Sequence, residues 1–136
     1  MSKDIHFSRL LGIQREQHGG RMQLAFSDDV QNHVGSMHAS AQFALAEIGS
    51  GDLMRQRFPE LADKVLAVVR RAEIKYSKAA SESLTAYPSI NDEDADKLLK
   101  RLESKGNGLL SVDVKLKTVA GETVTHAVYH WFVTKL

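Results

Sequence analysis

The sequence predicts an α+β fold in which one antiparallel sheet wraps around a central helix. Helical and strand patterns follow one another without the β-α-β alternation that builds parallel sheets, and there is no internal repeat. The segment 36–50 has a helical pattern but is rich in Ala, Ser and Gly, so a curled sheet can approach it closely. The last strand is apolar on both faces, which predicts that both faces are covered.

The N-terminal part is expected to hold one helix and one strand. Residues 1–20 are interpreted as a short amphipathic helix over 3–14, followed by a turn at the His-Gly-Gly of 18–20. Apolar and polar residues alternate over 21–27, which is typical of a half-buried strand.

The central helix is expected to run from about Ser36 to Ile48, within the segment 36–50. The Gly-Ser-Gly-Asp of 49–52 is expected to end it, because glycine commonly follows the last turn of a helix. A short helical turn over 53–58, stopped by a proline, is expected next.

The C-terminal part is expected to contain four strands and one inserted helix. The strands are expected over 63–80, 81–90, 109–119 and 124–136. The helix is expected over 91–105, because Asn91 can cap it, three acids follow in its first turn, and Gly106 can end it.

Composition indicates one domain, 1–136, and excludes several classes of function. The net charge is +1, which argues against nonspecific nucleic-acid binding, since that requires a clear basic excess. The chain contains no cysteine, so disulfides, thiolate metal sites and a cysteine nucleophile are excluded. There is no signal-peptide pattern and no apolar run of the ~20 residues that cross a membrane. We therefore expect a cytoplasmic protein without a membrane partner.

A set of residues with regular spacing surrounds the start of the central helix. It comprises Asn32, Gly35, His38, Ala39-Ser40 and Leu45-Ala46-Glu47. The run resembles the Asn-x-x-Gly-x-x-His-Gly-Gly and Leu-Ala-Asp/Glu motif of hotdog-fold acyl-CoA thioesterases, in particular the phenylacetyl-CoA-type branch and its uncharacterised relatives. Ala39-Ser40 stands where that branch has Gly-Gly.

The resemblance extends over about residues 21–136. It implies the hotdog fold, in which the sheet wraps around the helix, and hydrolysis of an acyl thioester to a free acid and a thiol. It also implies a homodimer or a dimer of dimers with sites at subunit interfaces. No separate cofactor is expected, because coenzyme A is part of the substrate.

Thioester hydrolysis requires a carboxylate and N–H donors for the oxyanion, and the run supplies both. Glu47 is the expected base or nucleophile, and its apolar neighbours predict a raised pKa. With Ser36 as the helix cap, the N–H groups at 37–39 are expected to be free, and Ala39 is the expected oxyanion donor. Asn32 is expected to hold the water or the carbonyl, and His38 to orient or pack.

Helix geometry separates the two main groups. Ala39 and Glu47 are eight residues apart, which is roughly 12 Å along one helix at ~1.5 Å per residue. They cannot reach one carbonyl from the same chain. Two antiparallel copies of the helix would place them side by side, so the sequence predicts a twofold dimer.

Other residues are expected to contact the substrate or to have no chemical role. Gly35, Ser40 and Phe43 are expected at the substrate, and Arg70 and Arg71 at the phosphates of coenzyme A, although ordinary exposure explains the arginines equally well. Two further histidines, His126 and His130, lie about 13 Å apart on a strand, which is too far for a shared metal. No metal site is expected.

Three other functions remain open from the sequence. A noncatalytic module that binds acyl-CoA or a fatty-acyl group is the main alternative, because Ala39-Ser40 departs from Gly-Gly. A dehydratase would use a histidine on a Phe-Pro-Gly type loop, which the Gly-Ser-Met-His of 35–38 does not match. A purely structural dimerisation domain would have neither a pocket nor a ligand.

Overall fold

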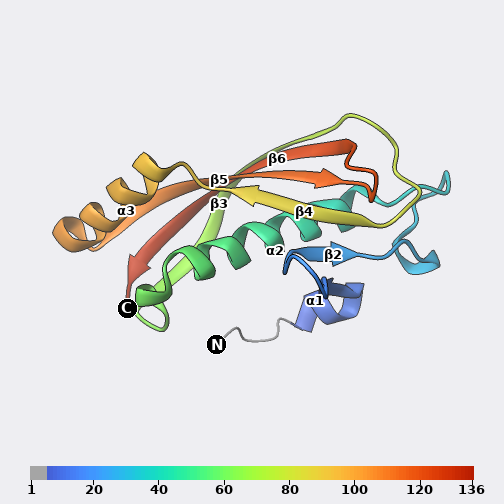
Figure 1. Ribbon diagram of the computed structural model, residues 1–136. Coiled ribbons are helices and arrows are strands. Elements are labelled where there is room, and N and C mark those ends of the chain that lie inside the picture. Colours follow the sequence, from blue (N-terminus) through green and yellow to red (C-terminus); the bar gives the residue numbers. More distant parts are fainter. Residues whose placement is uncertain (1–5) are drawn as a thin grey trace.

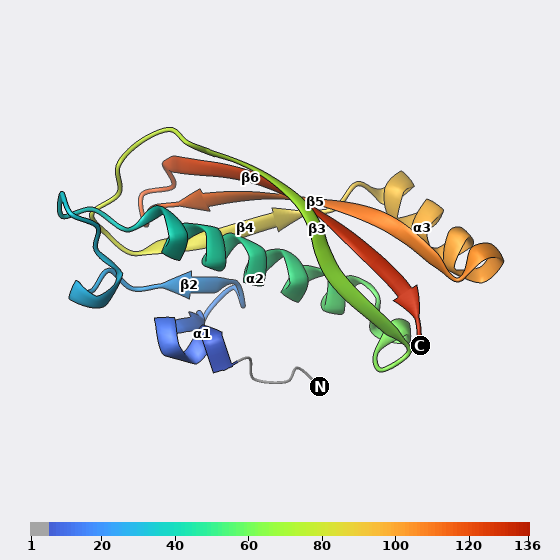
Figure 2. The ribbon, with the colours of Figure 1, turned by 180° about the vertical axis from the view of Figure 1, so that it is seen from behind.

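The sheet has six strands, each antiparallel to its neighbours. The computed structural model describes residues 6–136, in which the strands follow the order β1-β2-β4-β5-β6-β3. The bounds are Ile13–Arg15 (β1), Met22–Leu24 (β2), Val65–Tyr76 (β3), Leu84–Ser89 (β4), Asn107–Lys117 (β5) and Thr123–Lys135 (β6). The sheet curves around helix α2, Ala39–Arg57 (Figures 1 and 2). The predicted α+β architecture, a sheet wrapped around a small-residue helix, is confirmed.

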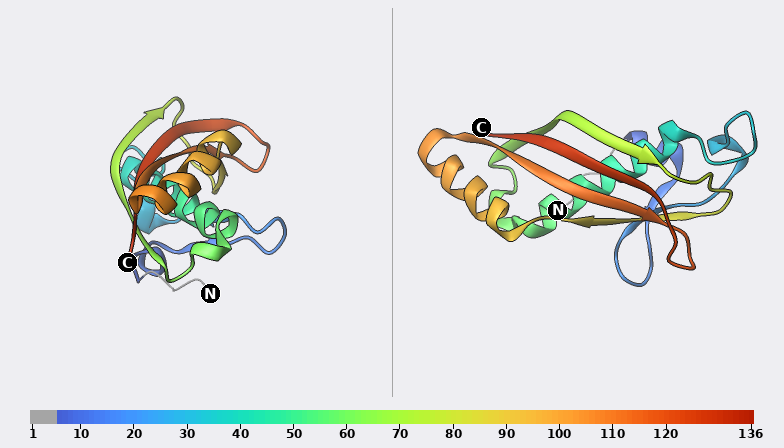
Figure 3. Two further views of the ribbon diagram at one scale, coloured as in Figure 1. Left: turned by 90° about the vertical axis from the view of Figure 1, so that its left-hand side faces the viewer. Right: turned by 90° about the horizontal axis from the view of Figure 1, so that it is seen from above.

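Small side chains allow α2 to lie close to the sheet. Ala41, Ala44, Leu45 and Ala46 are buried on the side that packs in the core. The left view of Figure 3 shows the sheet curving around the helix. This close packing explains why the segment is rich in small residues.

The prediction that α2 ends at 49–52 is wrong, since the helix continues to Arg57. Glycine here serves close packing and not a turn. A Cβ added at Gly49 would lie 2.7 Å from the Cβ of Ala86 on β4, and one at Gly51 would lie 3.3 Å from the ring of Trp131 on β6. Contacts with two strands therefore override the low helix propensity of glycine. The helical turn expected over 53–58 is the end of α2, and a 3-10 turn, Pro59–Leu61, follows it.

The N-terminal segment contains a strand that the sequence did not predict. Helix α1 covers His6–Leu11, and β1 then pairs with β2 as a hairpin. The expected helix over 3–14 is therefore shorter at its end, and residues 3–5 lie outside the described part. The predicted turn at 18–20 connects β1 to β2, and Gly19 and Gly20 both have positive φ there. Arg15 fixes the hairpin to α2, because its guanidinium donates to both carboxylate oxygens of the buried Asp52, at 2.7 and 2.9 Å.

The C-terminal elements lie close to their predicted positions. Helix α3, Asp92–Lys105, begins at Asn91, whose Oδ1 accepts from the Asp94 N–H at 3.1 Å, and ends at Gly106 with φ +80°. Its buried Leu98 and Leu102 face the start of β5, so α3 extends the molecule at one end (Figures 1 and 3). No helix within residues 6–136 is both long and apolar enough to cross a membrane.

Candidate active site

Asn32 folds the turn that leads into α2. Its Oδ1 accepts from the N–H groups of Val34 and Ser36, each at 3.0 Å, and its Nδ2 donates to the Ser36 Oγ at 2.8 Å. Gly35 completes the turn with φ +80°, a conformation that favours glycine. Most of the hydrogen-bonding capacity of the Asn32 side chain is therefore used within the turn, and one Nδ2 hydrogen is left for a ligand.

The first turn of α2 exposes a single free backbone donor. The prediction that Ser36 caps the helix is wrong. His38 caps it, and its Nδ1 accepts from the Ser40 N–H at 3.0 Å. The N–H groups of Met37 and His38 donate at 2.7 Å to backbone carbonyls of two neighbouring loops. Among residues 6–136, no acceptor binds the N–H of Ala39, the first residue of the helix. Of the three N–H groups that were predicted to be free, at 37–39, only that of Ala39 has no acceptor among these residues.

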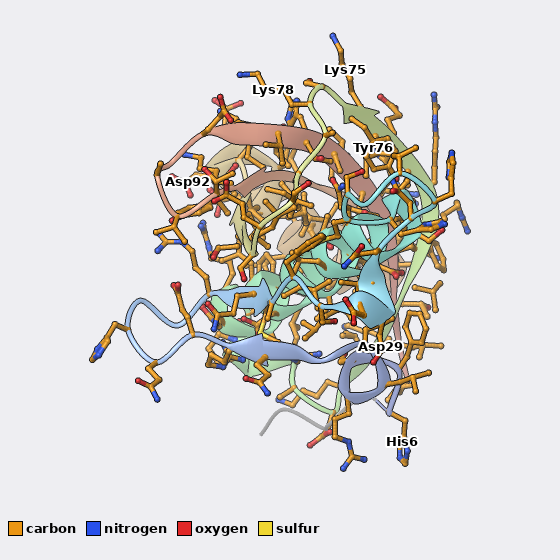
Figure 4. The ribbon with its side chains drawn as sticks, turned by 90° about the vertical axis from the view of Figure 1, so that its right-hand side faces the viewer. His6, Asp29, Lys75, Tyr76, Lys78 and Asp92 are labelled. Carbon is orange, nitrogen blue, oxygen red and sulfur yellow. The ribbon has the colours of Figure 1, made fainter. Side chains whose placement is uncertain are left out.

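A pocket of about 240 Å³ opens beside this donor. It is lined by the turn before α2 (Asn32, Ser36, Met37), the first turn of α2 (Ala39, Gln42) and the chain at the end of β3 (Tyr76 to Ala79). Figure 4 shows Lys75, Tyr76 and Lys78 together at this end of the molecule. The free N–H and the positive end of the α2 dipole both favour an oxyanion in this pocket.

Glu47 lies two turns further along α2 and is half-buried. Desolvation raises its pKa above the ordinary value of a glutamate, as its apolar neighbours predict. Phe43, one turn earlier, packs edge-on against the ring of Tyr129 with 5.3 Å between the ring centroids. Burial, followed by the charge of Glu47, raises the pKa of Tyr129, so the phenol stays protonated.

Within one chain, Glu47 does not reach the pocket at the start of α2. It lines neither that pocket nor a second one of about 190 Å³, which lies between the β1–β2 hairpin, the C-terminal half of α2 and β4. The free N–H of Ala39 and the Glu47 carboxylate belong to one helix, two turns apart, and a single chain does not bring them together.

The other predicted substrate contacts are spread over two faces. Gly35 and Ser40 lie at the entry to α2. Arg70 stacks over Phe132, 4.1 Å from the ring centroid, and Arg71 pairs with Glu73 at 3.5 Å. Phe132 alternates with Trp131 and Val133, which face α2 and the core, so both arginines lie on the opposite face of the sheet.

His126 and His130 lie on that same outer face. His126 Nε2 lies 2.7 Å from Asp113 Oδ2, and His130 contacts Ser111 Oγ at 2.7 Å and Glu73 Oε1 at 3.2 Å. No group of three His, Asp or Glu in the described residues is placed to hold a metal ion.

Three pocket residues have no clear signal in the sequence. Gln42 is buried in the helix, where its Nε2 donates to the Met37 carbonyl at 3.1 Å and its Oε1 accepts from the Thr125 hydroxyl. Tyr76 and Lys78 reach the pocket only because β3 ends beside the first turn of α2. Neither periodicity nor residue spacing reports such a contact between distant segments.

Solved structures of low sequence identity share this fold. A protein of unknown function from Pseudomonas aeruginosa, described as a probable thioesterase, has a TM-score of 0.83 at 21% identity over 97% of this chain and 89% of that one. A Bacillus halodurans protein solved with CoA has a TM-score of 0.73 at 22% identity, covering 96% and 77%. A thioesterase from Haemophilus influenzae has a TM-score of 0.74 at 13% identity, covering 96% and 83%.

These likenesses establish the hotdog fold. No curated protein sequence matches the chain. The sequence profile of one family, however, matches residues 14–133, which is most of the chain, including the turn, α2 and all but the first residue of β1 and the last two of β6. The protein therefore belongs to the family described as a domain of unknown function, DUF4442.

Proposed function

We propose that the protein hydrolyses acyl-CoA thioesters as a twofold dimer. The observation that carries the proposal is the pairing of two complementary groups on α2. Ala39 offers a free N–H at the start of the helix, and Glu47 offers a half-buried carboxylate of raised pKa. Several proteins of the same fold are named thioesterases, and one was solved with CoA, which supports this reading.

The edge of the sheet favours a second copy as the partner. β3 is a 12-residue strand at the end of the strand order, so one side of its backbone pairs with no other strand among residues 6–136. Its apolar residues that pack against the core are only half-buried: Val65, Ala67, Val69, Ala72 and Ile74. Long apolar edge strands tend to pair with another strand. A twofold axis beside β3 would set two α2 helices antiparallel and place Glu47 near Ala39 of the partner subunit.

In the proposed reaction, Glu47 acts as a general base toward water. Water loses a proton to the carboxylate and attacks the thioester carbon, and the carbonyl electrons move onto the oxygen. The N–H of Ala39 of the partner subunit donates to that oxyanion. When the carbonyl re-forms, the C–S bond breaks, and the leaving thiolate takes the proton from Glu47.

The remaining predicted residues have supporting roles in this proposal. Asn32 holds the turn and has one Nδ2 hydrogen free for the water or the carbonyl. His38 caps the helix, so it orients the donor and is not the base. Gly35 and Ser40 shape the entry, and Phe43, one turn from Glu47, contacts the acyl group. Arg70 and Arg71 would bind the CoA phosphates only if these phosphates lie on the outer face of the sheet.

The test is thiol release from a panel of short, long and aromatic acyl-CoAs, for the wild type and Glu47→Gln. A disulfide reagent suits the assay because the chain contains no cysteine that could react. Turnover by the wild type that is lost in the variant is expected. Turnover that survives in Glu47→Gln would refute the role of Glu47. Acyl-CoA binding without turnover in either protein would instead indicate a noncatalytic binding module.

A further inference from the structure

Three backbone carbonyls on one stripe of α2 accept an additional hydrogen bond from a side chain. They belong to residues 39, 43 and 47, which are spaced by one turn each and therefore lie along the same side of the helix. The Tyr76 hydroxyl donates to the first at 3.0 Å, the Tyr129 hydroxyl to the second at 2.7 Å, and the Ser50 hydroxyl to the third at 2.7 Å. The Trp131 indole in turn donates to Ser50 at 3.0 Å. Aromatic residues of β3 and β6 thus hold α2 along the stripe that carries Glu47.

Tyr76 differs from the other two aromatic residues. Tyr129 is fully buried, whereas Tyr76 is 41% exposed and lines the pocket beside Ala39. Among the described residues, its hydroxyl makes the only side-chain hydrogen bond between β3 and α2. Figure 4 shows Tyr76 at the end of β3, at the end of the molecule where α2 begins. The bond therefore ties the edge strand to the turn that presents the oxyanion donor.

We propose that Tyr76 is a positioning residue for thioester hydrolysis, and that its hydroxyl holds the first turn of α2 so that the Ala39 N–H points into the pocket. This inference rests on the proposed function. Tyr76 acts through Ala39 and forms no bond to the reacting atoms.

The physical need for such a bond lies in the position of Ala39. Helix ends fray because their outer groups lack partners within the helix, and an oxyanion donor is effective only when its direction is fixed beforehand. His38 fixes the N–H of Ser40, and Gln42 fixes the carbonyl of Met37, but the Ala39 N–H has no acceptor in the described part of the chain. Within the helix, the peptide that carries this N–H is held by its own carbonyl, that of His38, which accepts from the N–H groups of Ala41 and Gln42 at 3.1 Å each. The bond from Tyr76 to the Ala39 carbonyl adds a constraint from outside the helix. Desolvation raises the pKa of Tyr76, so its hydroxyl keeps its proton and remains a donor at neutral pH.

The test compares Tyr76→Phe with the wild type in thiol release. The change removes one oxygen and leaves the ring. We expect kcat to fall about tenfold, because a less firmly held Ala39 N–H stabilises the oxyanion less well, and KM to change by less than about twofold. Amide hydrogen exchange at 40–42, where the N–H groups are hydrogen-bonded, should become faster in the variant, because the first turn loses its tie to β3.

Tyr87→Phe is the matched control. Tyr87 lies on β4, and its ring contacts Arg21 and Lys117, at 4.3 and 4.7 Å from the ring centroid. Within residues 6–136 its hydroxyl makes no hydrogen bond, so removing it should change neither kcat nor exchange at 40–42. Equal melting temperatures for the two variants would show that the effect of Tyr76→Phe is local.

Each outcome decides the inference. A lower kcat with nearly constant KM in Tyr76→Phe, but not in Tyr87→Phe, supports the positioning role. Wild-type turnover with unchanged kcat in Tyr76→Phe overturns the positioning role and leaves the proposed function standing. A large rise in KM without a fall in kcat also overturns it, because Tyr76 would then bind the substrate directly. An inactive wild type overturns both.

Discussion

Ala39→Pro removes the proposed oxyanion donor with little other change to the fold. Proline is well accepted at the first position of a helix, where its fixed φ suits the helix and the lost N–H has no intrahelical partner. The residue before a proline must be extended, and His38 already has φ −59° and ψ 139°. The Ala39 N–H bonds no acceptor in residues 6–136, so folding loses no hydrogen bond. We expect the free energy of unfolding to stay within about 1 kcal/mol of the wild type.

The effect on catalysis should be much larger. Loss of one oxyanion donor typically lowers kcat by about 10²–10³, or about 2.7–4 kcal/mol of transition-state stabilisation. Thiol release and thermal unfolding, measured together, separate the two effects. Ala39→Gly is the control, because it keeps the N–H and restores the glycine of the related motif, and it should retain activity. An Ala39→Pro protein that is folded and turns over within a few-fold of the wild type would refute the role of this N–H.

The same variant tests whether the site spans two subunits. Ala39→Pro lacks the donor and Glu47→Gln lacks the carboxylate, so each homodimer is inactive in both sites. When the two are refolded together, about half of the dimers are mixed, and each mixed dimer has one complete site. We expect about one quarter of the wild-type activity to return. Failure to recover any activity, with mixed dimers shown to form, would exclude a site shared across this interface.

Two further predictions concern α2. Burial raises the pKa of Glu47, so the native protein binds its proton more tightly than the unfolded chain, and stability falls as pH rises from the ordinary glutamate pKa through the raised one. Thermal unfolding should therefore show Glu47→Gln to be more stable than the wild type above that pH window and equally stable below it. The kcat/KM of the wild type should rise across the window as the base loses its proton. Equal melting temperatures at all pH values would contradict the buried carboxylate. Gly49→Ala should destabilise the protein by about 1–3 kcal/mol in urea unfolding, because the new methyl would lie 2.7 Å from Ala86. In Gly51→Ala the new methyl would lie 3.3 Å from Trp131 and the helix propensity increases, so the free energy of unfolding should stay close to that of the wild type. An equal loss of stability in both variants would show that packing is not the cause.

Local patterns in the sequence predicted much of this fold. The helix over 91–105 was placed correctly because its start and end signals, Asn91 and Gly106, act within a few residues of the chain. The sheet strands were placed to within a few residues where apolar alternation is strong. The β1 strand was missed, since three residues give too little periodicity and their pairing with β2 is a contact between segments.

The candidate site was predicted in part. The motif resemblance pointed to Ala39 and Glu47, and the structure gives the first a free N–H and the second a raised pKa, while their catalytic roles stay predictions. The number of free donors was predicted wrongly, because it depends on the carbonyls of Val30 and Ala80, which come from other segments of the chain. The cap was also predicted wrongly, since His38 and not Ser36 caps the helix through its Nδ1.

The sequence by itself determined that a small-residue helix lies within an antiparallel sheet, and that Ala39 and Glu47 lie two turns apart on it. Those features depend on residue size and on the fixed rise of a helix, which act along the chain. Tertiary structure alone decided that glycines 49 and 51 continue the helix, that one N–H at its start is free, and that Tyr76 reaches its first turn. The reason is that each of these depends on atoms of β3, β4, β6 or distant loops, whose approach is set by packing and leaves no periodic trace in the sequence.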